Sequence, residues 1–233
     1  MTPDLTRFQA LTFDCYGTLI DWESGILGTL RPILAAHGRQ VLDTEVLRVY
    51  SEIEPRIQAA VYQRYRAILG QVVEEMGQRF AFTPTMTEKQ SLPESLQHWQ
   101  PFPDTVEALR KLKQRYQLYI ISNIDDDMIA ASARHLQVPF DGIITAQQVG
   151  AYKPSLQNFE VALERIKLPK EKILHVAGSL FHDVVPTRQI GITNCWVNRR
   201  QGKPAGASGT ADIKPDLEVR DLAELAAMIS RKI

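Results

Sequence analysis

The stretch FDCYGTLIDW, residues 13–22, decides how the rest of the chain is interpreted. An apolar, strand-like run ends at Asp14, and Gly17 and Thr18 follow within four residues. A carboxylate at the end of a buried strand is costly to desolvate, so it is normally paired, bound to a cation or used in chemistry. Asp14 is therefore a candidate nucleophile, with helix capping or a simple ion pair as the alternative.

Short apolar runs followed by turn-forming or helix-starting residues recur along the chain, with longer amphipathic segments between them. The runs are FQALTFD, LYIIS, GIIT, ILHVAG and TNCWV, at residues 8–14, 118–122, 142–145, 173–178 and 193–197. Such alternation is typical of β and α units around a mostly parallel sheet that is buried on both faces. The sequence therefore predicts an α/β fold with a doubly wound core.

The interval between the first two runs, about residues 22–98, contains no strand-like run. Its apolar residues recur at helical spacing in GILGTLRPILAAHG, DTEVLRVYSEIEPRIQAAVYQRYRAIL and ESLQHWQ. We therefore expect a helical cap over residues 22–98, inserted into a core made of residues 1–21 and 99–233. Residues 201–216 predict a loop rich in Gly, Pro, Ser and Ala, and residues 220–233 predict a final helix.

The composition favours an enzyme that acts on small molecules. The 233 residues, 44% of them hydrophobic, can supply an ample core. Lys+Arg and Asp+Glu both total 27, so the chain has no general attraction for nucleic acid or anionic membrane. No apolar run reaches the roughly 18 residues that span a bilayer, the N-terminal residues lack a signal-peptide pattern, and two cysteines are too few for a disulfide framework. We expect a cytoplasmic protein with a small-molecule substrate and no nucleic-acid or membrane partner.

Reactive side chains stand at or just beyond four of the predicted strand ends. In open parallel sheets, ligands bind outside the carboxyl ends of the strands, where loops converge. One carboxylate there is weak evidence, whereas four sets in chain order are far more specific. Hydroxyl and amide groups among them can donate hydrogen bonds to an anionic substrate group. The sets are Asp14 with Thr18, Ser122 with Asn123, Lys153 in VGAYKP, and Ser179 with His182 and Asp183.

The segments FDCYGTL, ISN, KP and GSLFHD resemble, in order and spacing, the four motifs of the haloacid dehalogenase superfamily. The resemblance covers nearly the whole chain if residues 22–98 are the helical cap that many members insert after the first motif. It implies a Rossmann-like core in which Asp14 attacks the substrate and forms a covalent intermediate, while Lys153 pairs with it. On physical grounds, a nearby ammonium favours the ionised carboxylate and holds it for in-line attack.

Tyr16 distinguishes two kinds of chemistry within this superfamily. Most members resemble phosphatases, with a second aspartate two residues after the nucleophile that protonates the leaving alcohol. Loss of a positioned general acid–base costs about 10²–10⁴-fold in rate, whereas a halide leaves as a stable anion. The tyrosine-containing first motif is similar to that of the 2-haloacid dehalogenases. This similarity implies that Asp14 attacks the carbon α to a carboxylate and that water hydrolyses the ester. Tyr16, like Trp22, could wall an apolar pocket for the substrate carbon or pack the cap against the core.

The fourth motif indicates the same chemistry. Ser179 stands where the phosphatase pattern usually has an acidic residue that helps to hold Mg²⁺. No metal is required in the dehalogenase interpretation, and the alternative is Mg²⁺ held by Asp14 and Asp183. Asp183 would help to position water and would pair with Lys153. His182 could act as a base or orient water, since histidine titrates near neutral pH, or it could face elsewhere.

Two positions depart from the dehalogenase pattern. Phe159 stands where a tyrosine is common, and Leu180 stands where an asparagine is expected shortly before the last aspartate. The cap of such enzymes also supplies an arginine that receives the departing halide. Aligning YQRYRAIL with the corresponding helix makes Arg56 the candidate, with Arg64 and Arg66 nearby.

Three functions therefore stand open. The first is a hydrolase resembling the (S)-2-haloacid dehalogenases, acting on short 2-haloalkanoic acids. The second is a Mg²⁺-dependent phosphatase or phosphonate-cleaving relative that uses the same Asp14, and the third is a catalytically idle binding or assembly protein. Metal dependence separates the first two, and a covalent adduct on Asp14 would exclude an inert scaffold. The resemblance is also compatible with a homodimer.

Overall fold

One six-stranded sheet, with every neighbouring pair parallel, organises the part of the chain that this computed structural model describes, residues 3–201 and 211–230. The strand order is β3-β2-β1-β4-β5-β6. The strands are β1 (Ala10–Phe13), β2 (Gln117–Ser122), β3 (Gly142–Thr145), β4 (Ile173–Ala177), β5 (Thr193–Val197) and β6 (Leu217–Val219). The predicted α/β fold with a parallel sheet is confirmed.

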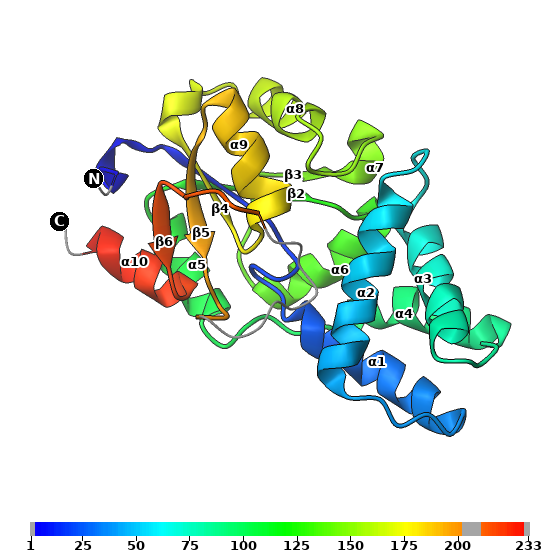
Figure 1. Cartoon of the computed structure of the whole chain (residues 1–233). Coiled ribbons are helices and arrows are strands. Elements are labelled where there is room, and N and C mark those ends of the chain that lie inside the picture. Colours follow the sequence, from blue (N-terminus) through cyan, green and yellow to red (C-terminus); the bar gives the residue numbers. More distant parts are fainter. Residues whose placement is uncertain (1–2, 202–210, 231–233) are drawn as a thin grey trace.

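Helices cover both faces of the sheet (Figure 1). On one face lie α5 (Thr105–Lys113), α6 (Asp126–Leu136) and α10 (Leu222–Ser230), and on the other lie α8 (Gln157–Ile166) and α9 (Val185–Ile190). Alternate strand residues point to opposite faces. Leu11 and Phe13 of β1 therefore join one apolar cluster, which includes Leu109 of α5, while Ala10 joins another with Phe159 of α8. Burial on both faces explains why the strands are almost continuously apolar.

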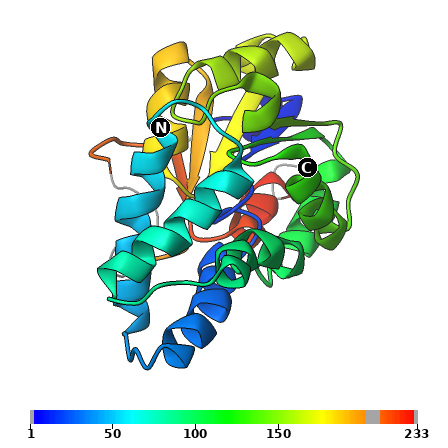
Figure 2. The same ribbon diagram turned by 90° about the vertical axis from the view of Figure 1, so that its right-hand side faces the viewer.

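Four helices stand together to one side of the sheet, as Figures 1 and 2 show. They are α1 (Trp22–Ala36), α2 (Asp43–Gln58), α3 (Tyr65–Arg79) and α4 (Met86–Ser95). The amphipathic run over residues 43–69 is thus divided into two helices. Asp125, just before α6, accepts hydrogen bonds from the backbone N–H groups of Tyr65 and Arg66 at 3.1 and 3.0 Å. A carboxylate at a helix N-terminus satisfies free N–H groups and complements the helix dipole, so Asp125 anchors α3 to the core.

Shorter helical segments complete the chain between the main elements. They are α7 (Ala146–Val149), the 3₁₀ turns η1 (Leu5–Arg7), η2 (Leu96–His98) and η3 (Lys170–Lys172), and the π-helical turn η4 (Leu180–Val184). The turn η4 directly follows the fourth predicted strand and its glycine. π-Helical turns are rare and are often found at functional sites.

The sequence analysis identified five of the strands and missed β6. This strand has three residues and pairs only with β5 at the edge of the sheet, so its pattern is too short to stand out from a loop. Most of the predicted loop over residues 201–216 falls on residues 202–210, which lie outside the described residues, as do residues 231–233 of the predicted final helix. The described part of that helix is α10.

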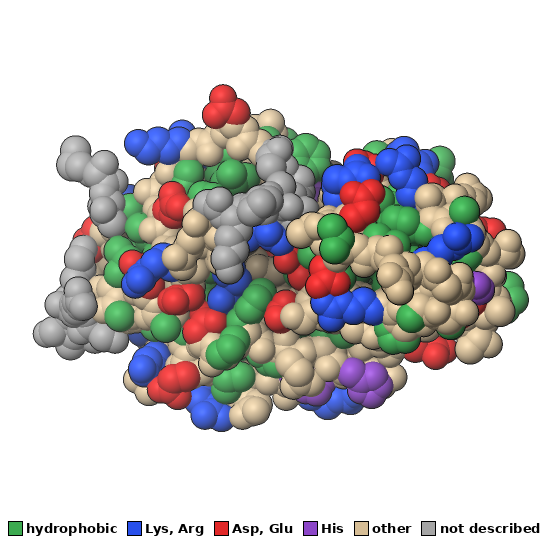
Figure 3. Space-filling model, turned by 60° about the horizontal axis from the view of Figure 1, so that its bottom comes forward, with side chains coloured by type: hydrophobic (Ala, Val, Ile, Leu, Met, Phe, Trp, Pro, Cys, Tyr) green, Lys and Arg blue, Asp and Glu red, His purple; other side chains and the backbone are tan. Residues whose placement is uncertain are grey.

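The length of the apolar helices and the distribution of surface charge are relevant to membrane and nucleic-acid partners. No helix in the described part of the chain is both long and apolar enough to cross a bilayer. Basic and acidic side chains are interspersed over the face seen in Figure 3. The expected lack of nucleic-acid partners and the homodimer remain predictions.

Candidate active site

The strand order reverses between β1 and β4, because β2 and β3 extend the sheet to one side of β1 while β5 and β6 extend it beyond β4. Crevices at such a switch point are the usual ligand sites of open α/β sheets. Asp14 directly follows β1, Ser122 ends β2, and Gly178 follows β4. The register pairs Phe13 with both Ile120 and Val176, which brings the three strand ends level.

Lys153 lies between the two predicted carboxylates. Its ammonium donates hydrogen bonds to Asp14 Oδ1 at 2.9 Å, to Asp183 Oδ1 at 2.7 Å and to the Ile121 carbonyl at 2.9 Å, and its side chain is 1% exposed. The side chain of Asn123 holds the lysine's backbone, since its Oδ1 accepts from Lys153 N–H and its Nδ2 donates to the Lys153 carbonyl. Asn123 therefore positions the lysine as well as bordering the site.

Thr18 holds the other oxygen of the candidate nucleophile. Its hydroxyl donates to Asp14 Oδ2 at 2.6 Å and accepts from the Gly178 N–H at 2.8 Å, so it serves the aspartate and the loop after β4. Gly17 has a φ of +89°, and a Cβ at Gly178 would lie 2.6 Å from the Gly17 carbonyl oxygen. The two loops approach this closely because Gly178 lacks a side chain, while the positive φ of Gly17 is a conformation that favours glycine.

His175 is part of the site, although the sequence showed it only as an isolated histidine in an apolar strand. Its Nε2 lies 2.9 Å from Asp183 Oδ1, and its Nδ1 lies 2.8 Å from the hydroxyl of Thr12, which is its register partner on β1. Phe159 packs edge-on against the imidazole, with ring centroids 5.2 Å apart. A buried histidine needs polar partners, and that need is the signal in the sequence that could have revealed it.

These contacts shift the pKa values of Asp14 and Asp183 in opposite directions. Burial raises the pKa of Asp14 above its usual value, and Lys153 and Thr18 oppose that rise. For Asp183, burial is outweighed by Lys153 and His175, which hold its pKa below the usual value. The pKa of Lys153 is raised, since its two carboxylate partners outweigh burial. Asp183 and Lys153 thus form a permanent ion pair, and Asp14 is the carboxylate that takes up a proton first as pH falls.

Ser179 positions His182 at the start of η4. The serine hydroxyl accepts from the backbone N–H of His182 at 3.1 Å and lies 3.3 Å from its Nδ1. Burial lowers the pKa of His182 to about 4, so the imidazole is neutral at pH 7. A neutral imidazole at this place can accept a proton from water.

A cavity of about 60 Å³ joins these groups, and it is lined by Asp14, Tyr16, Trp22, Glu54, Gln58, Tyr65, Ser122, Asn123, Lys153, Ser179, His182 and Asp183. Among the described residues, the buried Ser122 Oγ and Asp183 Oδ2 have no hydrogen-bond partner. Buried polar atoms are rarely left unsatisfied, so two of them beside one cavity indicate where a substrate or water binds. A wider cavity of about 440 Å³ shares Gln58, Lys153 and His182 with it and extends to the half-exposed Phe181.

Tyr16 lines the cavity, but its hydroxyl contacts a residue that does not. Its hydroxyl lies 2.7 Å from Ser132 Oγ on α6, and its ring packs edge-on against Trp99. Burial raises the pKa of Tyr16 well above its usual value. The residue is therefore a wall of the cavity without a hydroxyl free for proton transfer.

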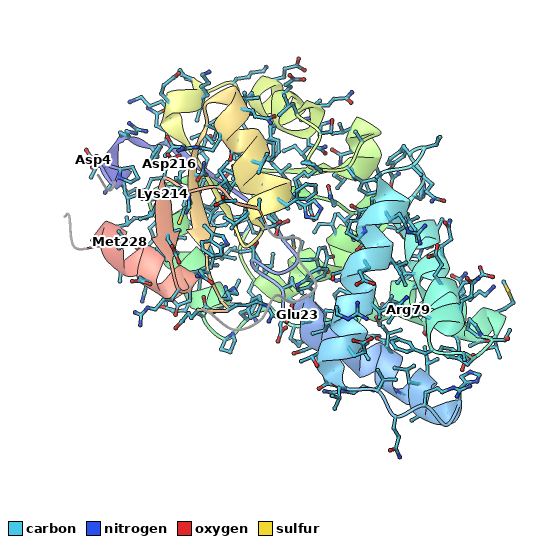
Figure 4. All side chains as sticks on the ribbon, viewed as in Figure 1. Asp4, Glu23, Arg79, Lys214, Asp216 and Met228 are labelled. Atoms are coloured by element: carbon cyan, nitrogen blue, oxygen red, sulfur yellow. The ribbon has the colours of Figure 1, made fainter. Side chains whose placement is uncertain are left out.

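Arg56 does not lie in the cavity. It is on the outer surface of α2, with its side chain 62% exposed and paired with Glu75 of α3. It borders a surface depression shared with Arg79, which Figure 4 labels among the four helices. The residue of α2 that does line the cavity is Glu54, two positions earlier, which the sequence analysis missed. The assignment of Arg56 to substrate binding is therefore not supported by its position.

A family model described as a haloacid dehalogenase-like hydrolase matches residues 8–185. The chain belongs to that family. The (S)-2-haloacid dehalogenase of Pseudomonas fluorescens is 28% identical over 235 residues, which cover 95% of this chain and 96% of that protein. Haloacetate dehalogenase H-2 of Moraxella sp. (strain B) is 28% identical over 208 residues, 84% of this chain and 88% of that protein.

Solved structures of the haloacid dehalogenase-like hydrolase family share the fold. The L-2-haloacid dehalogenase from Xanthobacter autotrophicus, in a structure with chloropropionic acid covalently bound, superposes with a TM-score of 0.81 at 19% identity and covers 96% of this chain and 98% of that one. An L-2-haloacid dehalogenase named PA0810 gives a TM-score of 0.81 at 23% identity. The likeness extends over the sheet and the four helices together.

Mg²⁺ is the metal that the phosphatases of this family would need here, and the residues do not fit it. The Lys153 ammonium already lies within hydrogen-bond distance of both Asp14 and Asp183, the two proposed ligands. Within residues 3–201 and 211–230, no group of three or more His, Cys, Asp or Glu side chains is arranged to hold a metal ion. Lys153 engages Oδ1 of each carboxylate and Thr18 donates to Asp14 Oδ2, so Asp183 Oδ2 is the one oxygen of the pair that has no hydrogen-bond partner among the described residues, too few for a divalent cation.

Proposed function

We propose that this protein is a hydrolytic dehalogenase that acts on short 2-haloalkanoic acids through an ester on Asp14. The observation that carries the proposal is the set of contacts made by Asp14 and Tyr16 in the first motif. Asp14 stands in a small cavity against the Lys153 ammonium, and the side chain two positions later is a tyrosine committed to Ser132. A leaving group that needs no proton suits this site, and the relatives named above are dehalogenases.

The first step is an in-line displacement at the carbon α to the substrate carboxylate. An oxygen of Asp14 forms the C–O bond while the carbon–halogen bond breaks, and the halide leaves with the electron pair. Lys153 and Thr18 hold the carboxylate in place for attack. The unpartnered hydroxyl of Ser122 can donate a hydrogen bond to the substrate carboxylate.

The second step is hydrolysis of the aspartyl ester by water at the carbonyl carbon of Asp14. Asp183 Oδ2 is buried and unpartnered among the described residues, so it can accept a hydrogen bond from that water. His182 is neutral at pH 7 and lines the same cavity, so it can take the proton. The reaction returns Asp14 to its ionised form and releases the 2-hydroxy acid.

The proposal is tested by halide release from L- and D-2-chloropropionate, chloroacetate, fluoroacetate and 2-chlorohexanoate, with p-nitrophenyl phosphate alongside, each with Mg²⁺ or EDTA. We expect halide release that survives EDTA, and a cavity of about 60 Å³ favours the shorter acids. Asp14→Asn is the inactive control. Turnover in ¹⁸O-labelled water should place the label in Asp14, since the ester is cleaved at its carbonyl carbon.

Three results would contradict the proposal. Nitrophenol release that depends on Mg²⁺ and is lost in Asp14→Asn, without any halide, would make the protein a phosphatase. Label that enters the product in a single turnover but never enters Asp14 would mean that water displaces the halide directly. Silence with every substrate would favour the idle binding protein.

A further inference from the structure

The wall of the cavity that faces Asp14 from the helices carries an acid. Trp22 of α1, Glu54 and Gln58 of α2 and Tyr65 of α3 form this wall. Glu54 is 6% exposed, and none of its hydrogen-bond partners is a cation. Lys153, on the opposite side, is the one Lys or Arg among the described residues that line the cavity.

The hydrogen bonds of Glu54 converge on one of its two oxygens. The hydroxyl of Tyr65 donates to Oε1 at 3.1 Å, and the amide of Gln58 donates to the same atom. Tyr65 is held in turn by the hydroxyl of Tyr50 and by Asp125, which anchors the first turn of α3. Oε2 receives neither of these hydrogen bonds, so it is the oxygen that remains for the cavity.

The charges around the cavity determine which protonation state of Glu54 allows an anion to bind there. Asp14 and Asp183 contribute two negative charges and Lys153 contributes one positive charge. An ionised Glu54 would add a third carboxylate to the lining of the cavity and would repel a departing halide at short range in a low-dielectric surrounding. A neutral Glu54 has a hydroxyl on Oε2 and becomes a hydrogen-bond donor. Burial raises the pKa of Glu54 to about 7, although Tyr65 and Gln58 oppose that rise.

We propose that Glu54 works as a neutral carboxylic acid whose Oε2–H donates a hydrogen bond to the departing halide. The inference rests on the proposed dehalogenase function and deepens it. In an in-line displacement the halide leaves on the side away from Asp14, which is the side of the four helices. The proton stays on Glu54, and the halide carries away the electron pair of the broken bond. Fluoride is the smallest halide and the strongest hydrogen-bond acceptor, so 2-fluoro acids gain most from this donor.

The first test is the pH dependence of kcat/KM for fluoride release from 2-fluoropropionate in wild type, Glu54→Gln and the matched control Glu52→Gln. Wild type should lose activity about tenfold for each pH unit above about 7, as Glu54 ionises. Glu54→Gln keeps an N–H donor and cannot ionise, so its alkaline profile should be flat. Glu52, 51% exposed on the same helix, should leave the wild-type profile unchanged. An alkaline limb that persists in Glu54→Gln would overturn the proposal.

The other titrating groups around Glu54 do not produce a loss of activity above about pH 7. Burial raises the pKa values of the tyrosines well above 9 and lowers the pKa of His182 to about 4. Asp14 must lose its proton to attack, so its titration makes activity rise with pH rather than fall. Lys153 and Asp183 stay ionised as a pair. The groups that face the glutamate from the surrounding elements are Tyr50, Tyr65, Tyr152, Asp14, Lys153, His182 and Asp183.

The second test separates hydrogen bonding from a structural role. Glu54→Leu should lower kcat/KM at pH 6 at least tenfold more for 2-fluoropropionate than for 2-bromopropionate, because bromide is a weak hydrogen-bond acceptor and leaves readily. Equal losses for the two substrates would overturn the proposal. Glu54→Gln should retain most of the fluoride release at pH 6, which guards against a variant that simply fails to fold.

Binding of propionate, the unhalogenated analogue, separates this inference from the proposed function. Calorimetry should show wild type binding propionate roughly tenfold or more tightly at pH 6 than at pH 8.5, with no such difference in Glu54→Gln. If that pH dependence appears while no halide is released from any substrate, the dehalogenase function and the halide as the ligand of Glu54 both fail, and only a neutral Glu54 beside a bound anion stands. If halide is released with a flat profile from pH 7 to 9, the role of Glu54 fails and the dehalogenase function stands.

Discussion

Replacing Glu54 with glutamine should remove a loss of stability that wild type undergoes as pH rises, independently of any substrate. A glutamate in the unfolded chain has its usual pKa of 4.5, whereas burial raises the pKa of Glu54 in the folded protein to about 7. Between these two values the folded state holds a proton that the unfolded state has released. The free energy of unfolding of wild type therefore falls as pH rises from 4.5 to about 7, and the loss is complete above that.

The size of this effect follows from the two pKa values. A difference of one pH unit corresponds to about 1.4 kcal/mol, so the rise from 4.5 to about 7 amounts to about 3 kcal/mol. Glu54 is 6% exposed, so solvent screens the effect little. Glutamine cannot ionise, and its carbonyl can accept the same hydrogen bonds from Tyr65 and Gln58. Any constant cost of the substitution cancels when two pH values are compared.

The assay is urea unfolding followed by tryptophan fluorescence at pH 5 and pH 8.5, for wild type, Glu54→Gln and Glu52→Gln. Between the two pH values, wild type should lose about 2.5 kcal/mol more stability than Glu54→Gln does. Glu52→Gln, altered at an exposed position, should follow wild type. If wild type and Glu54→Gln lose the same stability to within about 1 kcal/mol, Glu54 is not held neutral by the fold.

Further substitutions test the rest of the site. Lys153→Met should abolish halide release and lower the free energy of unfolding by about 3–5 kcal/mol, since two buried carboxylates lose their cation; halide release at the wild-type level would contradict this. His175→Phe should lower kcat more than it raises KM and cost about 1–3 kcal/mol in urea unfolding, because Asp183 loses a hydrogen bond; an effect on KM alone would speak against a positioning role. Arg56→Ala should leave the kinetics of halide release unchanged and alter stability by less than about 1 kcal/mol, since its ion pair is exposed; a large loss of activity would return Arg56 to the substrate site. Halide release should also fall as pH decreases through the raised pKa of Asp14, because only the ionised carboxylate attacks; a pH profile that rises toward pH 4 would contradict this.

Much of the core could be predicted because its signals are local. A strand buried on both faces is a short apolar run, and the polar residues that follow it stand at the carboxyl edge of a parallel sheet whatever the rest of the chain does. Asp14, Ser122 and Asp183 were found in this way, and the structure brings all three to one cavity. The three-residue strand β6 escaped, because so short a segment carries no periodicity and is a strand only by virtue of its pairing with β5.

Long-range partners decided what several of the predicted residues do. Thr18 and Asn123 were expected to bind substrate, yet their side chains hold Asp14 and the backbone of Lys153. His175 reaches Asp183 because only Gly178 and Ser179 separate the end of β4 from the start of η4. A hydroxyl or an imidazole offers the same hydrogen bonds in any sequence, and the packed structure determines which of the groups within reach accepts them.

The sequence by itself determined the parallel sheet, the helical interval and the carboxylate with its ammonium, since each follows from local pattern and motif order. Only the tertiary structure decided which side chains of α2 line the cavity. Successive helical residues are rotated by about 100°, so Glu54 and Arg56 point in nearly opposite directions, one into the cavity and one to solvent. The angle at which the helix packs on the core sets that direction, and the local sequence pattern does not specify this angle.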